Sequence, residues 1–332
     1  MKSLNTARSM LAGPALILLV GALVPLLLTS GFHLRLVTII CIYTILCTGF
    51  NLLYGYAGQI SMGQQGFFAL GAYAFTLLMS AGNWSFWSAL PAALLICAGV
   101  ALLIGIPLLR LRSHYLAMAT LCFGLVFAGI ASRWIEFTGG TAGMMVPSVK
   151  FSGHIVSRTE LYYAILLIMV LVLVMQNFIV STHMGRALMS LRGDETAAQS
   201  LGVNVTAWKL RIFILSSVLA GLAGIASAVV NRQVNPSFSE FPILVSILTI
   251  AVVGGLGTRY GALLGACVVV IAPQGLAAFG ESETIIYGVC LLLFLMFMPH
   301  GLSGLIPKLF GRIRRKAASP APGVVKAGEI KP

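Results

Sequence analysis

Four neutral polar side chains gather in one apolar stretch of the sequence, GQISMGQQGFFALGAY. They are Gln59, Ser61, Gln64 and Gln65. Amides and hydroxyls both donate and accept hydrogen bonds without carrying charge, so they suit the two ends of a zwitterion. On an ideal helix, Ser61 and Gln65 share a face because they are four residues apart, and Gln64 lies beside them. The pattern predicts the lining of a solute path, with Gln59 capping its entry. The alternative is interhelical hydrogen bonding, typically worth only about 0.6 kcal/mol per contact.

Other polar residues and a set of glycines extend this prediction. The further path-lining candidates are Asn51, Ser246 and Thr249. The glycines expected to act as hinges or packing sites are Gly58, Gly63, Gly66, Gly71, Gly254, Gly255, Gly257 and Gly261. Two glycine-interrupted segments, one towards each end of a chain, are typical of repeat halves that flank a binding site. An internal repeat is therefore one interpretation, and close helix packing through small residues is the other.

A second informative segment, RGDETAAQSLGVN, lies within residues 181–210, which we predict to form a cytoplasmic coupling loop. Asp194 is a good N-cap, Glu195 complements the helix dipole, and Gly202 can end a helix in the left-handed conformation. The pattern predicts a helix of about seven residues, which is too short to be stable alone in water. Either it packs on its own protein or it docks as a rigid plug into a partner. The residues assigned to this contact are Arg186, Arg192, Asp194, Glu195, Thr196, Ala197, Ala198 and Gly202.

The sequence contains no pattern typical of catalysis. It has no GxxxxGK(S/T) stretch to hold ATP phosphates, and no nucleophile–base–orienter set for hydrolysis. The six cysteines lie in apolar stretches without metal-ligand spacing, and the five histidines are scattered. We therefore expect a non-enzymatic chain that binds no metal or cofactor.

The elements that position these residues are predicted to be membrane helices. The chain is 59% hydrophobic and 9% charged, with a mean hydropathy of +1.00, whereas a soluble domain carries roughly a quarter of charged residues. Repeated apolar stretches of about 18 residues or more indicate helices that cross a bilayer. We predict an all-α integral membrane protein with ten transmembrane helices. Their expected bounds are 11–29, 36–53, 60–80, 87–109, 115–132, 161–180, 212–230, 241–256, 261–279 and 284–299.

The distribution of basic residues predicts the orientation. With the N-terminus in the cytoplasm, sixteen Lys and Arg residues fall inside and five outside, in agreement with the positive-inside rule. The net charge of +13 is then explained by the membrane and not by nucleic acid. Both termini are expected in the cytoplasm. Residues 1–307 form the transmembrane domain, and 308–332 a basic, disordered tail.

Several segments resemble a known family. TAAQSLG is similar to the EAAxxxG loop of ABC-importer permeases, the coupling helix that contacts the ATPase subunit, although Thr196 stands where the motif has Glu. GQISMGQQGFFALGAYA, RLRSHYLAMATLCF, FTGGTAGM and VVGGLGTRYGALLGA resemble segments of branched-chain amino-acid ABC permeases. The RLR stretch favours the LivM type over the LivH type.

The resemblance implies a permease subunit of a bacterial inner-membrane ABC importer for branched-chain or related amino acids. Its implied partners are a second, LivH-type permease, two ATPase subunits that bind ATP and Mg, and a periplasmic substrate-binding protein at outer loops that include Thr138–Gly143. Urea or short-amide ABC permeases share much of the pattern. An ion-coupled secondary carrier is the more distant alternative, because hardly any ionisable residue lies deep in a span.

Overall fold

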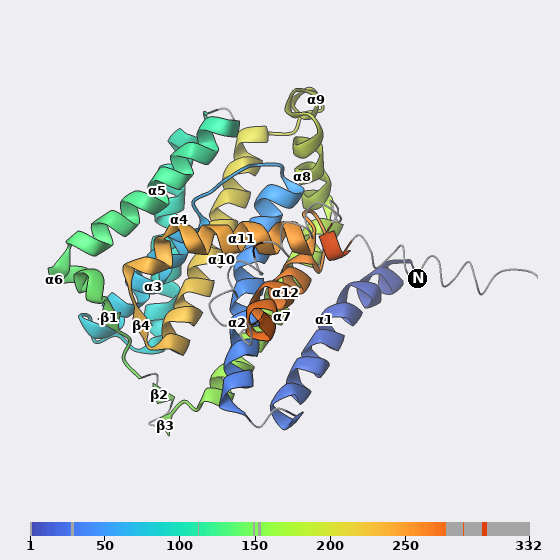
Figure 1. Cartoon of the computed structure of the whole chain (residues 1–332). Coiled ribbons are helices and arrows are strands. Elements are labelled where there is room, and N and C mark those ends of the chain that lie inside the picture. Colours follow the sequence, from blue (N-terminus) through green and yellow to red (C-terminus); the bar gives the residue numbers. More distant parts are fainter. Residues whose placement is uncertain are drawn as a thin grey trace, which may run out of the picture.

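The chain folds into a bundle of helices, shown in Figure 1. The computed structural model describes residues 2–27, 30–111, 113–148, 150–151, 154–276, 288 and 301–303. The predicted tail at 308–332 lies outside the described residues, and so does the predicted span at 284–299 apart from Gly288. The part of the chain that the structure describes is mostly helical, consistent with the all-α prediction, and also contains two short strand pairs.

Nine of the described helices are long. They are α1 (Lys2–Leu27), α2 (Gly31–Phe50), α3 (Gln64–Ser80), α4 (Phe86–Leu108), α5 (Ser113–Arg133), α7 (Arg158–Ser181), α10 (Val205–Asn231), α11 (Phe241–Gly254) and α12 (Gly261–Leu276). The shorter helices are α6 (Ile135–Thr138), α8 (His183–Gly193), α9 (Glu195–Ser200), the π-helix η1 (Asn51–Tyr56) and the 3₁₀ turns η2 (Gly140–Ala142) and η3 (Pro236–Ser239).

Two small antiparallel strand pairs lie at the end of the bundle opposite α9 (Figure 1). Strand β1 (Met144–Met145) pairs with β4 (Gln233–Val234), and β2 (Lys150–Phe151) pairs with β3 (His154–Ile155). The pairing of β1 with β4 ties the connection between α5 and α7 to the end of α10. These two connections were predicted on the outer side of the membrane.

Five helices in the described ranges are long and apolar enough to cross a membrane. They are Gly31–Tyr56, which joins α2 to η1, and Phe86–Leu108, His114–Arg133, Arg158–Ser181 and Val205–Asn231. The expected bounds were wrong at α3, which begins at Gln64 and not at residue 60, because Gly63 is its N-cap. Helix α11 has 14 residues, about 21 Å at 1.5 Å per residue, which is shorter than a hydrocarbon core of about 30 Å.

Helix α10 lies at the centre and packs most extensively on α3, α2 and α4. Small residues allow this close approach. A Cβ atom at Gly71 of α3 would overlap the backbone of Gly221 in α10, and one at Gly224 would overlap the carbonyl of Phe68. In a bilayer, where helices gain no hydrophobic energy by associating, such close contacts are a main source of packing energy.

The close contact between α3 and α10 yields a testable prediction. We expect Gly71→Ala to lower the Tm of the detergent-purified protein by about 3 °C or more, because an added methyl group in a filled interface costs about 1–3 kcal/mol. Gly99 of α4 is the matched control, since no atom lies within 4 Å of a Cβ built there. Gly99→Ala should leave the Tm unchanged or raise it, because Ala favours helices. A Tm for Gly71→Ala at or above that of the wild type would contradict this packing.

Candidate functional site

The chain between α2 and α3 is not a simple turn. Helix α2 continues into the π-helix η1, and residues 57–63 are then non-helical until α3 begins. The glycine at each end permits this path: Gly58 has a φ of 71°, and Gly63 is the N-cap of α3. The predicted helical face shared by Ser61 and Gln65 is therefore wrong, because Ser61 precedes the helix. Non-helical backbone at membrane depth is tolerated where it is buried in protein or lines a cavity.

This non-helical stretch and the start of α3 carry the predicted polar residues into the interior. Ser61, Gln64 and Gln65 are fully buried, and Gln59 is 4% exposed. Both polar atoms of Gln59 and of Gln65, the hydroxyl of Ser61 and Oε1 of Gln64 have no partner among the described residues. Each buried polar group left unpaired costs about 1–3 kcal/mol. We call Gln59, Ser61, Gln64 and Gln65 the buried amide group. Their unpaired polar atoms are therefore the strongest candidates for hydrogen bonds to a solute.

Two neighbouring helices hold the buried amide group in place. Gln64 Nε2 donates to Ser216 Oγ of α10 at 2.9 Å, and the Met62 backbone N–H donates to Thr120 Oγ1 of α5 at 3.0 Å. A Cβ atom at Gly124 of α5 would lie 2.6 Å from Gln65 Nε2, so the Gln65 amide rests on bare α5 backbone. Ser216 and Thr120 were missed from the sequence, because a lone hydroxyl in an apolar helix is usually bonded to its own helix.

Asn51 serves a different purpose from the amides at 59–65. Its Nδ2 donates to the Thr258 carbonyl at 2.8 Å, and its Oδ1 accepts from the Gly257 N–H at 2.7 Å. From α7, Gln176 Nε2 donates to the Arg259 carbonyl at 2.9 Å. Two amides thus hold the loop between α11 and α12. We assign Asn51 to holding this loop and not to the path.

The two candidates in α11 are less enclosed than the buried amide group. Ser246 and Thr249 are both only partly buried. Ser246 Oγ donates to the Pro242 carbonyl one turn earlier at 2.9 Å. Its hydroxyl is therefore engaged by its own helix, whereas the polar atoms of Gln65 have no partner among the described residues.

The eight predicted glycines serve two structural needs. Gly58, Gly255 and Gly257 have φ values of 71°, 101° and 74°, which only glycine adopts readily. The others allow close approach of backbones or side chains: Gly63 to Thr120, Gly66 to Phe123 and Gly124, Gly71 to Gly221, and Gly254 and Gly261 to each other.

The short helix predicted from RGDETAAQSLG is confirmed. Helix α8 ends at Gly193, and the Asp194 side chain caps α9 by accepting from the backbone N–H groups of Thr196 and Ala197. Hydrogen bonds from these two backbone donors, Ala197 first, lower the pKa of the Asp194 carboxyl below its usual value. After the helix, Gly202 has a φ of 81°. Local capping signals therefore determine both ends of α9.

Helix α9 is anchored on one side and free on the other. Ala198 is 1% exposed and belongs to the hydrophobic core, whereas Leu201 is 82% exposed. Glu195 forms an ion pair with Lys209 of α10 at 2.5 Å, so its carboxylate is engaged within the chain. In Figure 1, α9 projects from the end of the bundle opposite the strand pairs. An exposed Leu directly after a short helix, at its C-cap position, is suited to docking in a partner's groove.

Arg192 connects α8 to both glycine-rich segments. Its Nη1 donates to the Gly55 carbonyl in η1. A Cβ atom at Gly58 would lie 3.0 Å from the Arg192 Cγ, and one at Gly257 would lie 2.8 Å from its Nη1. Three segments therefore meet at the Arg192 side chain: the segment before α9, the end of η1, and the loop between α11 and α12. We call this the Arg192 junction. Arg186 is exposed on α8, the helix that directly precedes α9.

Comparison with known proteins agrees with this architecture. The family model for the permease component of branched-chain amino acid transport systems matches residues 32–298. The LivM permease proteins of high-affinity branched-chain amino acid transport in Salmonella typhimurium and Escherichia coli are 32% and 33% identical, covering 86% and 84% of this chain and 73% and 71% of theirs. The Escherichia coli LivH permease is 24% identical over 81% of this chain and 93% of its own.

No solved structure matches the chain. The family model covers most of the sequence, and several helices of this chain are apolar and long enough to cross a membrane, which implies a multi-pass membrane protein. The chain belongs to the family of permease components of branched-chain amino acid transport systems.

Proposed function

We propose that this chain is a non-catalytic permease subunit that moves branched-chain amino acids across the bacterial inner membrane. Membership of the permease family supports the class of function. The buried amide group supports an amino acid as the solute, because its neutral donors and acceptors have no partner among the described residues. They match the ammonium and carboxylate of an amino acid without a fixed charge that would repel either end.

The proposed assembly follows the names of the relatives. LivM and LivH proteins are both permease proteins of branched-chain amino acid transport, so we propose a LivH-type partner permease. Two ATPase subunits would bind ATP and Mg, and a periplasmic binding protein would meet the outer connections near Thr138–Gly143. Both termini would lie in the cytoplasm, as the sixteen basic residues on that side favour.

Coupling is proposed to run from α9 to the amides through the Arg192 junction. The ATPase would hold α9 by its exposed face at Leu201. Any rotation of α8 and α9 then moves Arg192, which bonds Gly55 and touches Gly58. Residues 58–63 lead from Gly58 to the start of α3 at Gln64, and a chain of about six residues spans about 20 Å at most. Movement at the junction therefore reaches the buried amide group along one short segment.

The role of the buried amide group can be separated from folding. We expect Gln65→Leu to reduce leucine uptake by the assembled transporter about tenfold or more, because a hydrogen bond to a charged group contributes about 1.5–3 kcal/mol. Its Tm should be unchanged or higher, because an unpaired buried amide is removed. Competition with unlabelled urea or short amides in the same uptake assay identifies the solute class.

Thr76→Val is the matched control for Gln65→Leu. Thr76 is fully buried in the same helix, but its hydroxyl is bonded to the Ala72 carbonyl. Its uptake should remain within about twofold of the wild type. Full leucine uptake by Gln65→Leu would remove this glutamine from the solute path.

The docking role of α9 is tested at its most exposed residue. We expect Leu201→Asp to abolish leucine uptake and co-purification of the ATPase while the protein still inserts, because an apolar docking contact becomes a buried charge. Leu111→Asp places the same change on another exposed leucine, in the connection between α4 and α5. This control variant should keep both leucine uptake and co-purification of the ATPase. Normal ATPase retention by Leu201→Asp would contradict docking at this face.

A further inference from the structure

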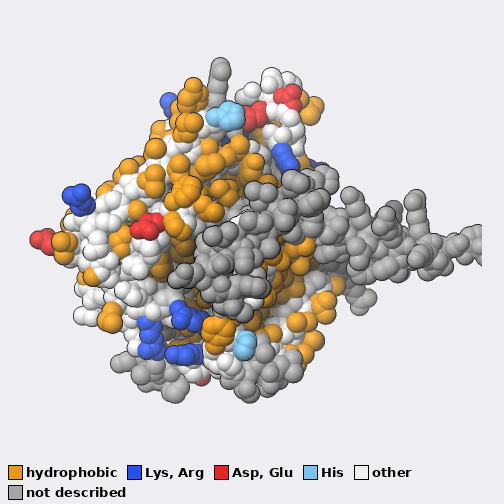
Figure 2. Space-filling model, in the orientation of Figure 1, with side chains coloured by type: hydrophobic (Ala, Val, Ile, Leu, Met, Phe, Trp, Pro, Cys, Tyr) orange, Lys and Arg blue, Asp and Glu red, His pale blue; other side chains and the backbone are white. Residues whose placement is uncertain are grey.

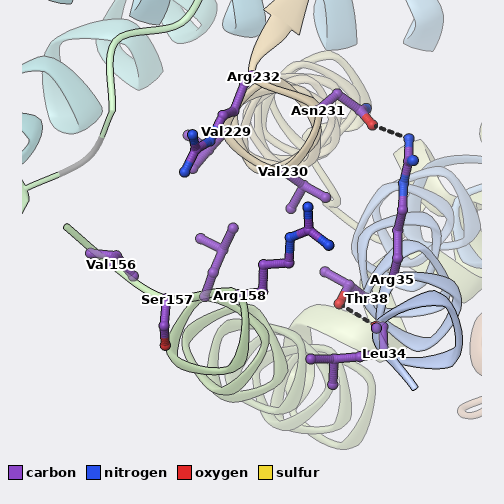
Figure 3. A pocket seen from close by; sticks show the side chains of 12 residues that line it. Leu34, Arg35, Thr38, Val156, Ser157, Arg158, Val229, Val230, Asn231 and Arg232 are labelled. Atoms are coloured by element: carbon purple, nitrogen blue, oxygen red, sulfur yellow. Dashed lines mark hydrogen bonds between the residues drawn. The ribbon is translucent and has the colours of Figure 1, made fainter. Parts of the chain in front are cut away.

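A cavity of about 340 Å³ opens at the end of the bundle opposite α9. It lies where the first residues of α2 and α7 meet the last residues of α10, as Figure 3 shows. Its walls include apolar side chains from each helix, among them Leu34, Leu161 and Val230. Its size falls within the range of small-ligand pockets, about 300–1,000 Å³. The buried amide group and the Arg192 junction are not part of its lining.

Three arginines, one from each helix end, line this cavity. They are Arg35 of α2, Arg158 of α7 and Arg232, which caps α10. In Figure 3 the Arg158 side chain extends into the space between α7 and α10, towards Val230. Arg35 Nη2 donates to Asn231 Oδ1 at 3.1 Å, which fixes its direction. No lining residue is acidic, so the lining itself provides three positive charges and no carboxylate to balance them.

The backbone adds to this positive potential. The cavity touches the N-terminal ends of two helices, at Gly31 of α2 and at Ser157 and Arg158 of α7. Helix N-termini carry a partial positive charge and favour anions. The nearest acidic residue along α7, Glu160, accepts from the Ser157 backbone N–H at 2.8 Å and so closes a capping box on its own helix.

These arginines lie on the predicted outer side of the membrane, where basic residues are scarce. Of 21 basic residues only five fall on the predicted outer side, and three of those five line this one cavity. All three are exposed at the ends of long apolar helices, which is the depth of lipid headgroups.

We propose that this cavity is a binding site for a phosphate group, from an anionic phospholipid headgroup or from free phosphate. Phosphate has more oxygens than a carboxylate, and guanidinium groups from three directions can each reach one or two of them. All three arginines are exposed, so a phosphate group can approach them from outside the bundle. Bound phosphate would tie α2, α7 and α10 together at their outer ends.

The test uses the full-length protein purified in a neutral detergent. We expect phosphatidylglycerol to raise its Tm by about 3 °C or more, whereas zwitterionic phosphatidylcholine should not. Inorganic phosphate without lipid forms the second arm. A shift with phosphatidylglycerol alone assigns the site to a lipid headgroup, and a shift with inorganic phosphate assigns it to the free ion.

Variants establish that the cavity is responsible. The double variant Arg158→Gln with Arg232→Gln should lose the shift, and so should Val230→Phe, which fills the cavity without changing its charge. Arg133→Gln removes an arginine from the same predicted side of the membrane, outside the lining, and should keep the shift. The proposal is overturned if neither phosphate source shifts the Tm, if phosphatidylcholine acts equally, or if both cavity variants keep the full shift.

Discussion

The structure depends on hydrogen-bond partners for the backbone and amide groups that lie in its low-dielectric interior. A helix satisfies its own peptide groups, so a break inside the bundle must be supported from elsewhere. The chain breaks at residues 57–63. Arg192 donates to the Gly55 carbonyl just before that break, and Thr120 accepts from the Met62 N–H within it. Asn51, also before the break, accepts from the Gly257 N–H in the loop between α11 and α12. A small set of neutral side-chain groups near this break has no partner among the described residues. The proposed solute path would use those polar atoms.

Hydrogen bonds to the backbone also connect the segments around the buried amide group to the segment that ends in α9. Arg192 belongs to the segment that ends in α9, yet its guanidinium bonds η1 and touches the loop between α11 and α12. That loop is in turn held by Asn51 and Gln176. Under the proposed coupling, a displacement of α9 would move these segments with it. The central helix α10 packs closely on α3 through Gly71 and Gly221.

Local signals in the sequence were sufficient for some of these features and not for others. Helix α9 was predicted because Asp194 and Gly202 act on their own neighbours. The start of α3 was misplaced, because hydrophobic periodicity does not reveal where a glycine pair interrupts a helix. Gln176 was missed, since its partner Arg259 is 83 residues away. The Arg192 contact with Gly55 spans 137 residues, and only the folded bundle brings them together.

The most direct test of this account is the ratio of ATP hydrolysed to leucine transported by the assembled transporter carrying Arg192→Gln. If the Arg192 junction transmits movement from α9 to the buried amide group, uptake should fall about tenfold or more while ATP hydrolysis stays within about twofold, so the ratio rises. Arg110→Gln, an exposed arginine outside the junction, should keep the wild-type ratio. A wild-type ratio for Arg192→Gln would contradict coupling through this residue.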